Sequence, residues 1–228
     1  MILNLQNIHK SYINPGSGIE RKILNGIDLN IDPGDSIAIV GPSGCGKSTL
    51  LNIMGSITKP DAGKIIFNGE DIDHYDKIQL SYLRNKHIGF VFQQHHLLPQ
   101  LTMMENVLLP LLEEKNRDLK KQAKRRAEDL LDLVNLIDLS SSYPNQLSVG
   151  ECQRSAVVRA LINEPDILLA DEPTGSLDED AAFNLVDLLL RINKEQNQSL
   201  VMVTHALDLA VKMNKGYRLR NGQLAELD

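Results

Sequence analysis

The chain has 228 residues, which is enough to bury a sizeable hydrophobic core as one large domain. Hydrophobic residues make up 42% of the chain and charged residues 24%, a composition typical of a folded globular protein and not of a disordered one. The net charge of −6 argues against broad electrostatic binding to nucleic acid. The lack of tryptophan also weakens any proposal that bases stack on aromatic side chains.

A membrane-spanning segment and a leader peptide are not expected. A spanning helix needs about 20 apolar residues, whereas the longest unbroken apolar run, residues 107–112, is short and includes Pro110. The first residues lack the basic flank and apolar stretch of a signal peptide, so we expect a cytoplasmic protein. The two cysteines, Cys45 and Cys152, are too few for a disulfide framework or a four-ligand zinc site.

Five segments have the patterns of β-strands. Residues 2–8 and 27–31 alternate apolar and polar side chains, which is typical of half-exposed antiparallel strands. Residues 37–40, 167–170 and 200–203 are apolar without alternation, which indicates parallel strands covered on both faces, and each is followed by a predicted helix. The sequence therefore predicts an α/β fold whose parallel strands carry ligands at their carboxyl ends.

The pattern between residues 95 and 165 changes to a helical period. One apolar stripe is predicted there, formed by Leu119, Ala123, Ala127, Leu130, Leu131, Val134 and Ile137. We expect a helical subdomain at approximately 95–165, inserted into an α/β core at approximately 1–94 and 166–228. No low-complexity linker separates these parts, so residues 1–228 are predicted to form a single domain.

A basic segment lies within this helical region. Residues 115–126 include seven lysines and arginines. A solvated helix face is one interpretation of such a run, and a surface that meets an anionic membrane or a nucleic acid is the other.

A phosphate-binding loop follows the strand at residues 37–40. It fits the pattern G-x-x-x-x-G-K-[ST] and consists of Gly41, Pro42, Ser43, Gly44, Cys45, Gly46, Lys47, Ser48 and Thr49. Its glycines let successive N–H groups point at phosphate oxygens, next to the positive end of a helix dipole. We expect Lys47 to contact the β- and γ-phosphates, Ser48 to bind Mg²⁺, and Thr49 to lie near the α-phosphate. The loop predicts ATP as the bound nucleotide.

Two carboxylates follow the buried strand at residues 167–170. An Asp-Glu pair before Pro173 could simply begin a turn, but beside a phosphate loop it suits metal-assisted hydrolysis. Asp171 is predicted to hold Mg²⁺ directly or through water. Glu172 is predicted to orient and polarise the water that attacks the γ-phosphate.

The segment around Ser148 completes a recognisable set of motifs. Residues 147–154 read Leu-Ser-Val-Gly-Glu-Cys-Gln-Arg and resemble the L-S-G-G-[QE] signature of ATP-binding-cassette (ABC) ATPases, with Ser148, Gly150 and Glu151 as its nucleotide-contacting positions. Further matches occur in the expected order along nearly the whole chain. They are Tyr12 for the adenine-stacking A-loop, Gln93 for the Q-loop that meets Mg²⁺ and water, Asp178 for the D-loop and His205 for the switch histidine.

The resemblance implies a fold, a catalytic set and an assembly. The fold is the P-loop NTPase fold of ABC ATPases, with a RecA-like parallel-sheet core, an antiparallel β subdomain and an inserted helical subdomain. Glu172, His205 and Gln93 are its catalytic residues, and Ser48, Gln93 and Asp171 its Mg²⁺ ligands. Two copies are expected to face each other head to tail in a homodimer, with each ATP held between one phosphate loop and the partner's signature, since the start of a helix at Ser148 and Gly150 forms a second anion site.

The resemblance also bears on the partner. Residues 89–107 and 204–224 resemble the lipoprotein-releasing branch of the family, which is related to MacB-type efflux ATPases and FtsE-type division ATPases. It implies a motor subunit at the cytoplasmic face of the inner membrane, attached to FtsX- or MacB-like membrane subunits. Export of antimicrobials and control of cell-wall hydrolases are the alternatives, and a nucleic-acid-associated cassette is disfavoured. Val149 and Ala206 depart from the family pattern.

Overall fold

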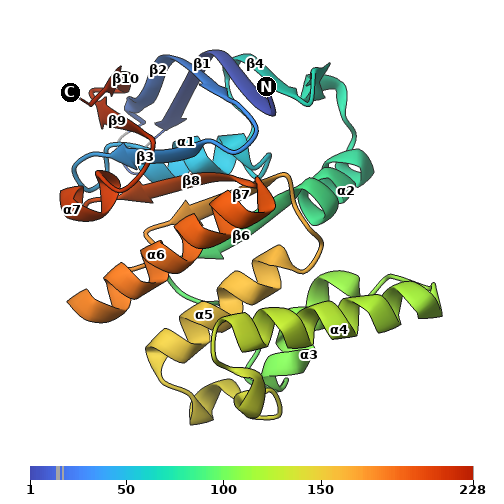
Figure 1. Ribbon diagram of the computed structural model, residues 1–228. Coiled ribbons are helices and arrows are strands. Elements are labelled where there is room, and N and C mark those ends of the chain that lie inside the picture. The colour runs from blue at the N-terminus through green and yellow to red at the C-terminus, as the bar shows by residue number, and fades with distance from the viewer. Residues whose placement is uncertain (14–15, 17, 228) are drawn as a thin grey trace.

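The computed structural model describes residues 1–13, 16 and 18–227. The strands of these residues form a four-stranded sheet and a six-stranded sheet. Figure 1 shows the two sheets above a layer of helices, with both chain ends close to the smaller sheet. This arrangement confirms the predicted α/β class, with a mostly parallel core sheet and an antiparallel β subdomain.

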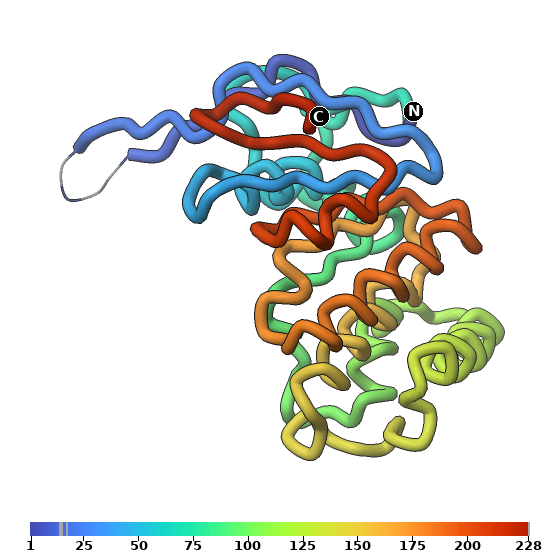
Figure 2. Tube along the Cα trace, turned by 60° about the vertical axis from the view of Figure 1, so that its left-hand side comes forward, coloured from blue at the N-terminus to red at the C-terminus, as the bar shows by residue number. Residues whose placement is uncertain are grey.

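The smaller sheet is antiparallel and contains the predicted alternating strands. Its order is β2-β1-β4-β5, with β1 (Leu3–Ile13), β2 (Glu20–Ile31), β4 (Ala62–Phe67) and β5 (Glu70–Asp71). Leu3, Leu5 and Ile8 of β1 are fully buried or nearly so, whereas Gln6 is exposed. The far end of the β1–β2 hairpin projects from the body of the molecule (Figure 2).

The larger sheet contains the three predicted buried strands side by side. Its order is β10-β9-β3-β8-β7-β6, with β3 (Ser36–Val40), β6 (Ile88–Phe92), β7 (Ile167–Asp171), β8 (Ser199–Thr204), β9 (Lys215–Arg220) and β10 (Gln223–Glu226). The neighbours from β9 to β6 run parallel, and β10 is antiparallel to β9. All residues of β3 and β8 are buried, as their continuous apolar sequences predict.

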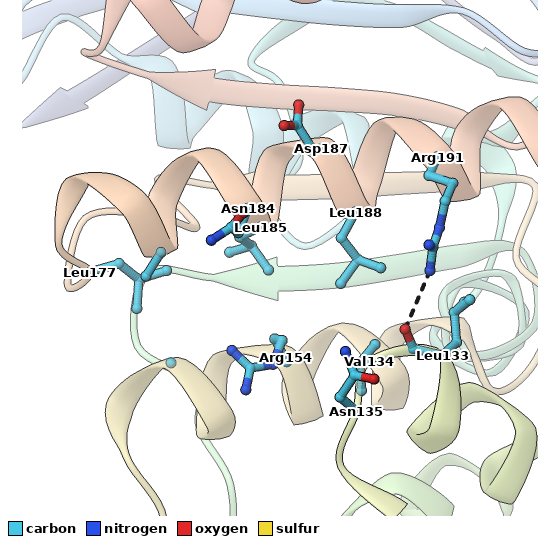
Figure 3. Close-up of a pocket in the computed structure, with 12 residues that line it drawn as sticks. Leu133, Val134, Asn135, Arg154, Leu177, Asn184, Leu185, Asp187, Leu188 and Arg191 are labelled. Atoms are coloured by element: carbon cyan, nitrogen blue, oxygen red, sulfur yellow. Dashed lines mark hydrogen bonds between the residues drawn. The ribbon is translucent and has the colours of Figure 1, made fainter.

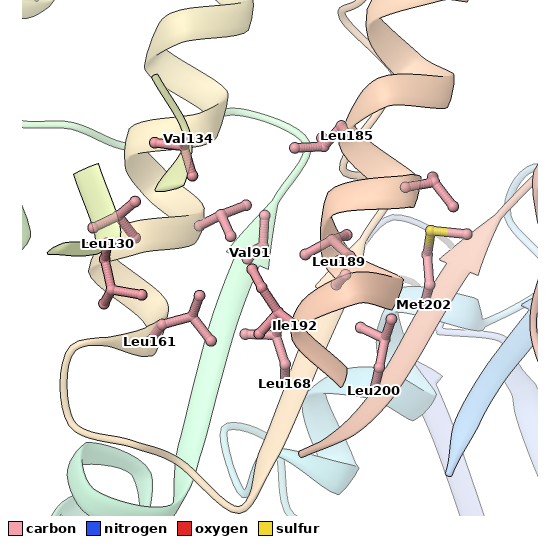
Figure 4. Close-up of a cluster of buried hydrophobic side chains, with 14 of the residues drawn as sticks. Val91, Leu130, Val134, Leu161, Leu168, Leu185, Leu189, Ile192, Leu200 and Met202 are labelled. Atoms are coloured by element: carbon pink, nitrogen blue, oxygen red, sulfur yellow. The ribbon is translucent and has the colours of Figure 1, made fainter. Parts of the chain in front are cut away.

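Helices cover both faces of the larger sheet. The helix α1 (Lys47–Met54) lies between the two sheets, and its Leu50, Leu51 and Ile53 pack in one cluster with residues of β1 and β3. The other face is covered by α6 (Glu179–Gln196) and by α5 (Val149–Leu161). Figure 4 shows part of the buried cluster to which Leu185 and Leu189 of α6 and Leu200 of β8 belong. The remaining elements beside the sheets are η1 (Ile72–His74), α2 (Lys77–His87) and α7 (Leu207–Ala210).

The predicted helical region contains three α-helices and short 3₁₀ turns within the described residues. They are α3 (Met103–Leu108), η2 (Leu109–Leu111), α4 (Arg117–Leu133), η3 (Ile137–Leu139), η4 (Pro144–Gln146) and α5. Ala123, Ala127, Leu130, Leu131 and Val134 are buried as predicted. The two ends of the predicted stripe are wrong, because Leu119 is 45% exposed in the first turn of α4 and Ile137 lies beyond that helix in η3. The domain boundaries stay a prediction.

No helix in the described part of the chain is both long enough and apolar enough to cross a membrane.

Asn106 holds the segment that leads from β6 into the helical layer. Its side chain is fully buried. It accepts a hydrogen bond from the Leu98 N–H at 2.7 Å and donates to the carbonyl oxygens of Leu98, Leu101 and Thr102 at 3.0–3.1 Å. One amide therefore bonds four backbone groups in a loop that has no regular pattern of backbone hydrogen bonds.

We expect Asn106→Ala to lower the free energy of unfolding by about 3 kcal/mol, because it removes a fully buried amide and leaves the Leu98 N–H and the Leu101 carbonyl oxygen without the bonds that it makes. Urea denaturation at equilibrium measures the effect. Asn184→Ala is the matched control, since Asn184 is exposed on α6 and should change stability by less than about 0.5 kcal/mol. Equal stability of the two variants would contradict the assigned role of Asn106.

Candidate functional site

The predicted phosphate loop connects β3 to α1. Gly44 and Gly46 have φ values of 73° and 108°, which glycine adopts without the steric cost that other residues incur. A Cβ atom at Gly41 would lie 2.5 Å from the Leu219 carbonyl oxygen, so this position also excludes a side chain. The loop can therefore curl with its backbone N–H groups facing inward, as phosphate binding requires.

Lys47 lies inside this loop. Its side chain is only 7% exposed, and its Nζ donates to the carbonyl oxygens of Gly41 at 2.8 Å and Pro42 at 3.3 Å. The same Nζ lies 3.4 Å from Oε1 of Glu172. The structure thus brings the lysine and the predicted catalytic carboxylate together, across more than half the length of the chain.

Ser48 and Asp171 form the second contact across the site. The Ser48 hydroxyl donates to Oδ1 of Asp171 at 2.9 Å. Burial raises the pKa of Asp171 above its ordinary value, the Ser48 hydrogen bond opposes that shift, and the neighbouring Glu172 carboxylate adds to it. A desolvated carboxylate beside a hydroxyl gains from a cation placed between them.

Glu172 has an unusual backbone conformation and lies between the side chains of Lys47 and His205. Its φ is 47°, in the left-handed region that residues with a side chain rarely adopt, and its N–H donates to the Val203 carbonyl oxygen at 3.0 Å. Its Oε2 lies 2.7 Å from Nδ1 of His205, the residue after β8. Backbone strain of this kind is maintained when a side chain must be aimed, here between Lys47 and His205.

Gln93 follows β6 and is exposed at the same edge of the sheet. Its carbonyl oxygen accepts a hydrogen bond from the Ser176 hydroxyl at 3.4 Å, and its side chain lies so close to Gly175 that a Cβ there would come within 2.7 Å of Nε2. The structure therefore places Gln93 against the segment that follows Glu172.

Two residues of α5 that sequence reasoning missed fix this segment. The buried Gln153 donates from Nε2 to the Phe92 carbonyl oxygen at 2.7 Å. Arg159 donates to the carbonyl oxygens of His95 and His96, each at 2.7 Å. Burial, with a smaller contribution from the Arg159 charge, lowers the pKa of His95. Both residues are polar side chains on the inner face of an otherwise apolar helix, and this pattern could have identified them in the sequence.

The predicted signature residues form the start of α5. Ser148 caps this helix, and Ser148 and Glu151 bond each other reciprocally in a capping box, which lowers the pKa of the Glu151 carboxyl chiefly through the Ser148 N–H. Within the described residues, no hydrogen bond or ion pair joins Ser148, Gly150 or Glu151 to Lys47 or Glu172. The structure therefore does not bring these two predicted parts of the site together in one chain.

Tyr12 and Asp178 lie at the periphery of the site. Tyr12 is 46% exposed on β1, opposite Arg21 of β2, whose guanidinium donates to the Gly44 carbonyl oxygen at 3.3 Å. This pairing places the tyrosine in the hairpin that lies beside the phosphate loop. Asp178 is exposed and caps α6 by accepting from the Ala181 N–H at 2.8 Å.

The two cysteines have different environments. Cys45 is partly exposed inside the phosphate loop, next to Gly41. Cys152 is 3% exposed, and burial raises the pKa of its thiol, so it packs as a small hydrophobic residue.

A cavity of about 480 Å³ lies between α6 and the helical layer (Figure 3). Gly150 and Leu177 line one part of it, and Arg191 donates across the gap to the Leu133 carbonyl oxygen at 3.3 Å. The contact between the helical layer and the core is therefore incomplete next to the predicted signature.

A glycine loop with a buried lysine after one parallel strand, and two carboxylates after another, define a phosphate-loop nucleotide-binding ATPase. Residues 24–175 match the family model described as ABC transporter, and the chain belongs to this family. It is an ATPase with the nucleotide-binding fold of that family.

Relatives and a solved structure of similar length support this family assignment. The chain is 45% identical to the lipoprotein-releasing system ATP-binding protein LolD 1 of Rhodopirellula baltica, over 98% of this chain and 96% of that protein. It is also 45% identical to LolD of Legionella pneumophila strain Paris, over 98% and 97%. The ATP-binding cassette MJ0796, solved as a dimer in a post-hydrolysis state bound to ADP and phosphate, is 36% identical, with a TM-score of 0.89 and coverage of 100% and 99%.

We expect Lys47→Met to lower the affinity for ATP by at least about tenfold, because it removes the cation inside the loop. Isothermal titration with ATP measures this loss. Lys215→Met is the matched control, since Lys215 also pairs with a carboxylate, Asp35 at 2.7 Å, but outside the loop. Unchanged ATP affinity in the Lys47 variant would contradict its placement in the site.

Proposed function

We propose that this chain is the ATP-hydrolysing subunit of a transporter that releases lipoproteins from the inner membrane, and that it acts as a homodimer at the cytoplasmic face of that membrane. The observation that carries the proposal is the near full-length identity of 42–45% to several proteins named as lipoprotein-releasing ATPases. The arrangement of Lys47, Glu172 and His205 supports the hydrolytic part of it.

The hydrolytic step is assigned to the residues that converge at the ends of β3, β7 and β8. Water attacks the γ-phosphorus, and the bond between that phosphorus and the oxygen bridging to ADP breaks. Glu172 polarises the water, Lys47 offsets the charge on the phosphate oxygens, and His205 contacts the γ-phosphate. Gln93 positions the water from the end of β6.

The donor set at Ser48 and Asp171 fits Mg²⁺. This ion is bound in nucleotide sites by one or two protein oxygens together with phosphate oxygens and water, and Ser48 Oγ and Asp171 Oδ1 are 2.9 Å apart. When bound, the ion would neutralise charge on the β- and γ-phosphates. Ser48 and Asp171 would hold it, with the amide oxygen of Gln93 as a third donor.

A second copy is proposed to complete the nucleotide site. Ser148 and Gly150 lie at the start of a helix of 13 residues, where unpaired N–H groups and the helix dipole favour an anion. Since this helix start forms no bond to the phosphate loop within the described residues, we assign the contact with the γ-phosphate to the signature of a second copy. The solved relative MJ0796 forms a dimer, which supports this assembly.

The membrane subunit is proposed to dock in a groove between the core and the helical layer. The groove has a volume of about 450 Å³ and is lined by Ser81 and Asn85 of α2, Phe90 of β6, Pro110 of η2 and Arg159 of α5, among others. Ile78 and Tyr82, on the same face of α2, are 79% and 62% exposed. An apolar rim beside a groove suits a helix from an FtsX- or MacB-like membrane protein.

We expect Glu172→Gln to abolish ATP hydrolysis while ATP still binds, so that an ATP-bound dimer accumulates. Phosphate release and size-exclusion chromatography with saturating ATP measure both effects. Glu164→Gln is the control, because Glu164 pairs with Arg126 away from the site. A Glu172 variant that remains monomeric with ATP would argue against the head-to-tail dimer.

We expect Ile78→Glu to weaken capture of the chain by its membrane subunit at least about tenfold, because a charge replaces the apolar rim. ATP hydrolysis by the isolated variant should stay near the wild-type rate. Val211→Glu, at a residue 77% exposed on the far side of the core, is the control for capture. Recovery of nucleic acid instead of a membrane protein would overturn the transporter proposal.

A further inference from the structure

The basic residues of the 115–126 segment form a largely exposed cluster on the helical layer. Six of them are exposed, namely Lys115, Arg117, Lys120, Lys121, Lys124 and Arg125. In the described part of the chain none of the six forms an ion pair or a side-chain hydrogen bond. The seventh, Arg126, is different, since it pairs with Glu164 at 2.5 Å and donates to the Leu161 carbonyl oxygen at 3.3 Å. We call the six the basic cluster.

Most charges of α4 run against the order that stabilises a helix. Asp118 in the first turn follows the favoured order, but the residues of the basic cluster after Lys115 occupy the first half of α4, and Glu128, Asp129 and Asp132 lie toward its carboxyl end. The helix dipole favours the reverse order, with anions near the start and cations near the end. The first half also contains like-charged pairs four residues apart, such as Lys120 with Lys124, and these repel each other. This order of charges lowers the stability of the helix, and the six basic side chains form no ion pair or side-chain hydrogen bond within the described residues. The charge order therefore points to a role outside the chain.

The cluster does not serve the nucleotide. In Figure 2, α4 lies at the lower right, on the far side of the molecule from the β1–β2 hairpin that carries Tyr12. The phosphate loop has its own buried cation in Lys47. The basic cluster is therefore available to an anionic partner other than the nucleotide.

The position of the cluster beside the docking groove indicates that partner. Leu109 and Pro110 line the groove and lead into α4 through Glu114. The pKa of Glu114 is lowered first by the Asn116 N–H and to a lesser extent by the charges of Lys86 on α2 and Lys120 on α4, so the first turn of α4 lies near α2. Leu112, which is 71% exposed, precedes the cluster. Exposed cations next to an exposed apolar residue are the combination that binds a lipid surface.

We propose that the basic cluster of α4 binds the anionic headgroups of the membrane in which the transporter partner resides. The buried stripe of Ala123, Ala127 and Leu130 and the Arg126–Glu164 ion pair hold the helix to the body, so the cluster meets the bilayer as a fixed surface. The identity of the membrane that is bound rests on the proposed function. Lipid binding itself needs no membrane subunit. Since the whole chain carries a net charge of −6, binding to an anionic surface requires such a local cluster.

Vesicle co-sedimentation with the full chain tests this proposal. Wild-type protein should sediment with vesicles of phosphatidylcholine and phosphatidylglycerol at low salt, should be released by high salt, and should not bind pure phosphatidylcholine. The triple variant Lys120→Gln, Lys121→Gln and Lys124→Gln should lose affinity by about 100-fold, since each basic residue near a lipid surface contributes roughly fivefold. The triple variant Lys22→Gln, Lys64→Gln and Lys194→Gln, at exposed lysines of β2, β4 and α6, removes the same charge and should bind.

Three outcomes would overturn the proposal. The first is a wild-type chain that ignores phosphatidylglycerol, and the second is an equal loss in both triple variants. The third is a cluster variant that keeps vesicle binding but loses capture by a detergent-solubilised membrane subunit, which would assign the cluster to an acidic protein segment. The proposed function is tested separately, by capture of the wild-type chain by that subunit and by dimer formation with ATP. Failure of the lipid proposal can therefore be distinguished from failure of the proposed function.

Discussion

The in-register pairing of three parallel strands is the constraint on which the rest of the site depends. Val40 of β3 lies opposite Thr204 of β8, and Asp171 of β7 lies opposite Val203. The groups that follow these strands, Lys47 through the loop, Glu172 and His205, therefore meet at one edge of the sheet. A slip of one residue would turn each side chain to the other face of the sheet and carry Glu172 or His205 away from Lys47, so the register of these strands fixes the geometry of the chemistry.

In the single chain the Glu172 carboxylate is compensated electrostatically by Lys47, and it also contacts His205. Lys47 and His205 flank the Glu172 carboxylate at 3.4 Å and 2.7 Å. A γ-phosphate and a water entering this space would compete for the same partners, which frees the carboxylate for the water as the lysine turns to the phosphate. The His205–Glu172 contact also anchors the histidine by itself, so Ala206, where the family has an acid, does not leave His205 without support.

Sequence reasoning predicted the strands and the loop because each has a local signal. Residues 37–40, 167–170 and 200–203 are continuous apolar runs, and the glycine loop has a fixed spacing. Leu119 and Ile137 were misplaced because periodicity alone does not show which turns of a helix are packed or where the helix ends. The first turn of α4, with Leu119, is exposed, and α4 ends at Leu133, before Ile137. Gln153 and Arg159 were missed because their role is to bond backbone carbonyls more than 60 residues away, which no local pattern encodes. The strain at Glu172 is likewise a property of the fold.

These two missed residues explain how events at the nucleotide could reach the groove. The helix α5 begins at the signature, holds the end of β6 through Gln153, holds His95 and His96 through Arg159, and lines the groove with Arg159 and Ala160. A helix of 13 residues moves as a rigid rod. The cavity between α5 and α6 leaves it room to do so (Figure 3). An anion bound at Ser148 by a second copy would therefore pull on the same element that shapes the groove, and a helix seated in the groove would, by reciprocity, change the affinity at Ser148.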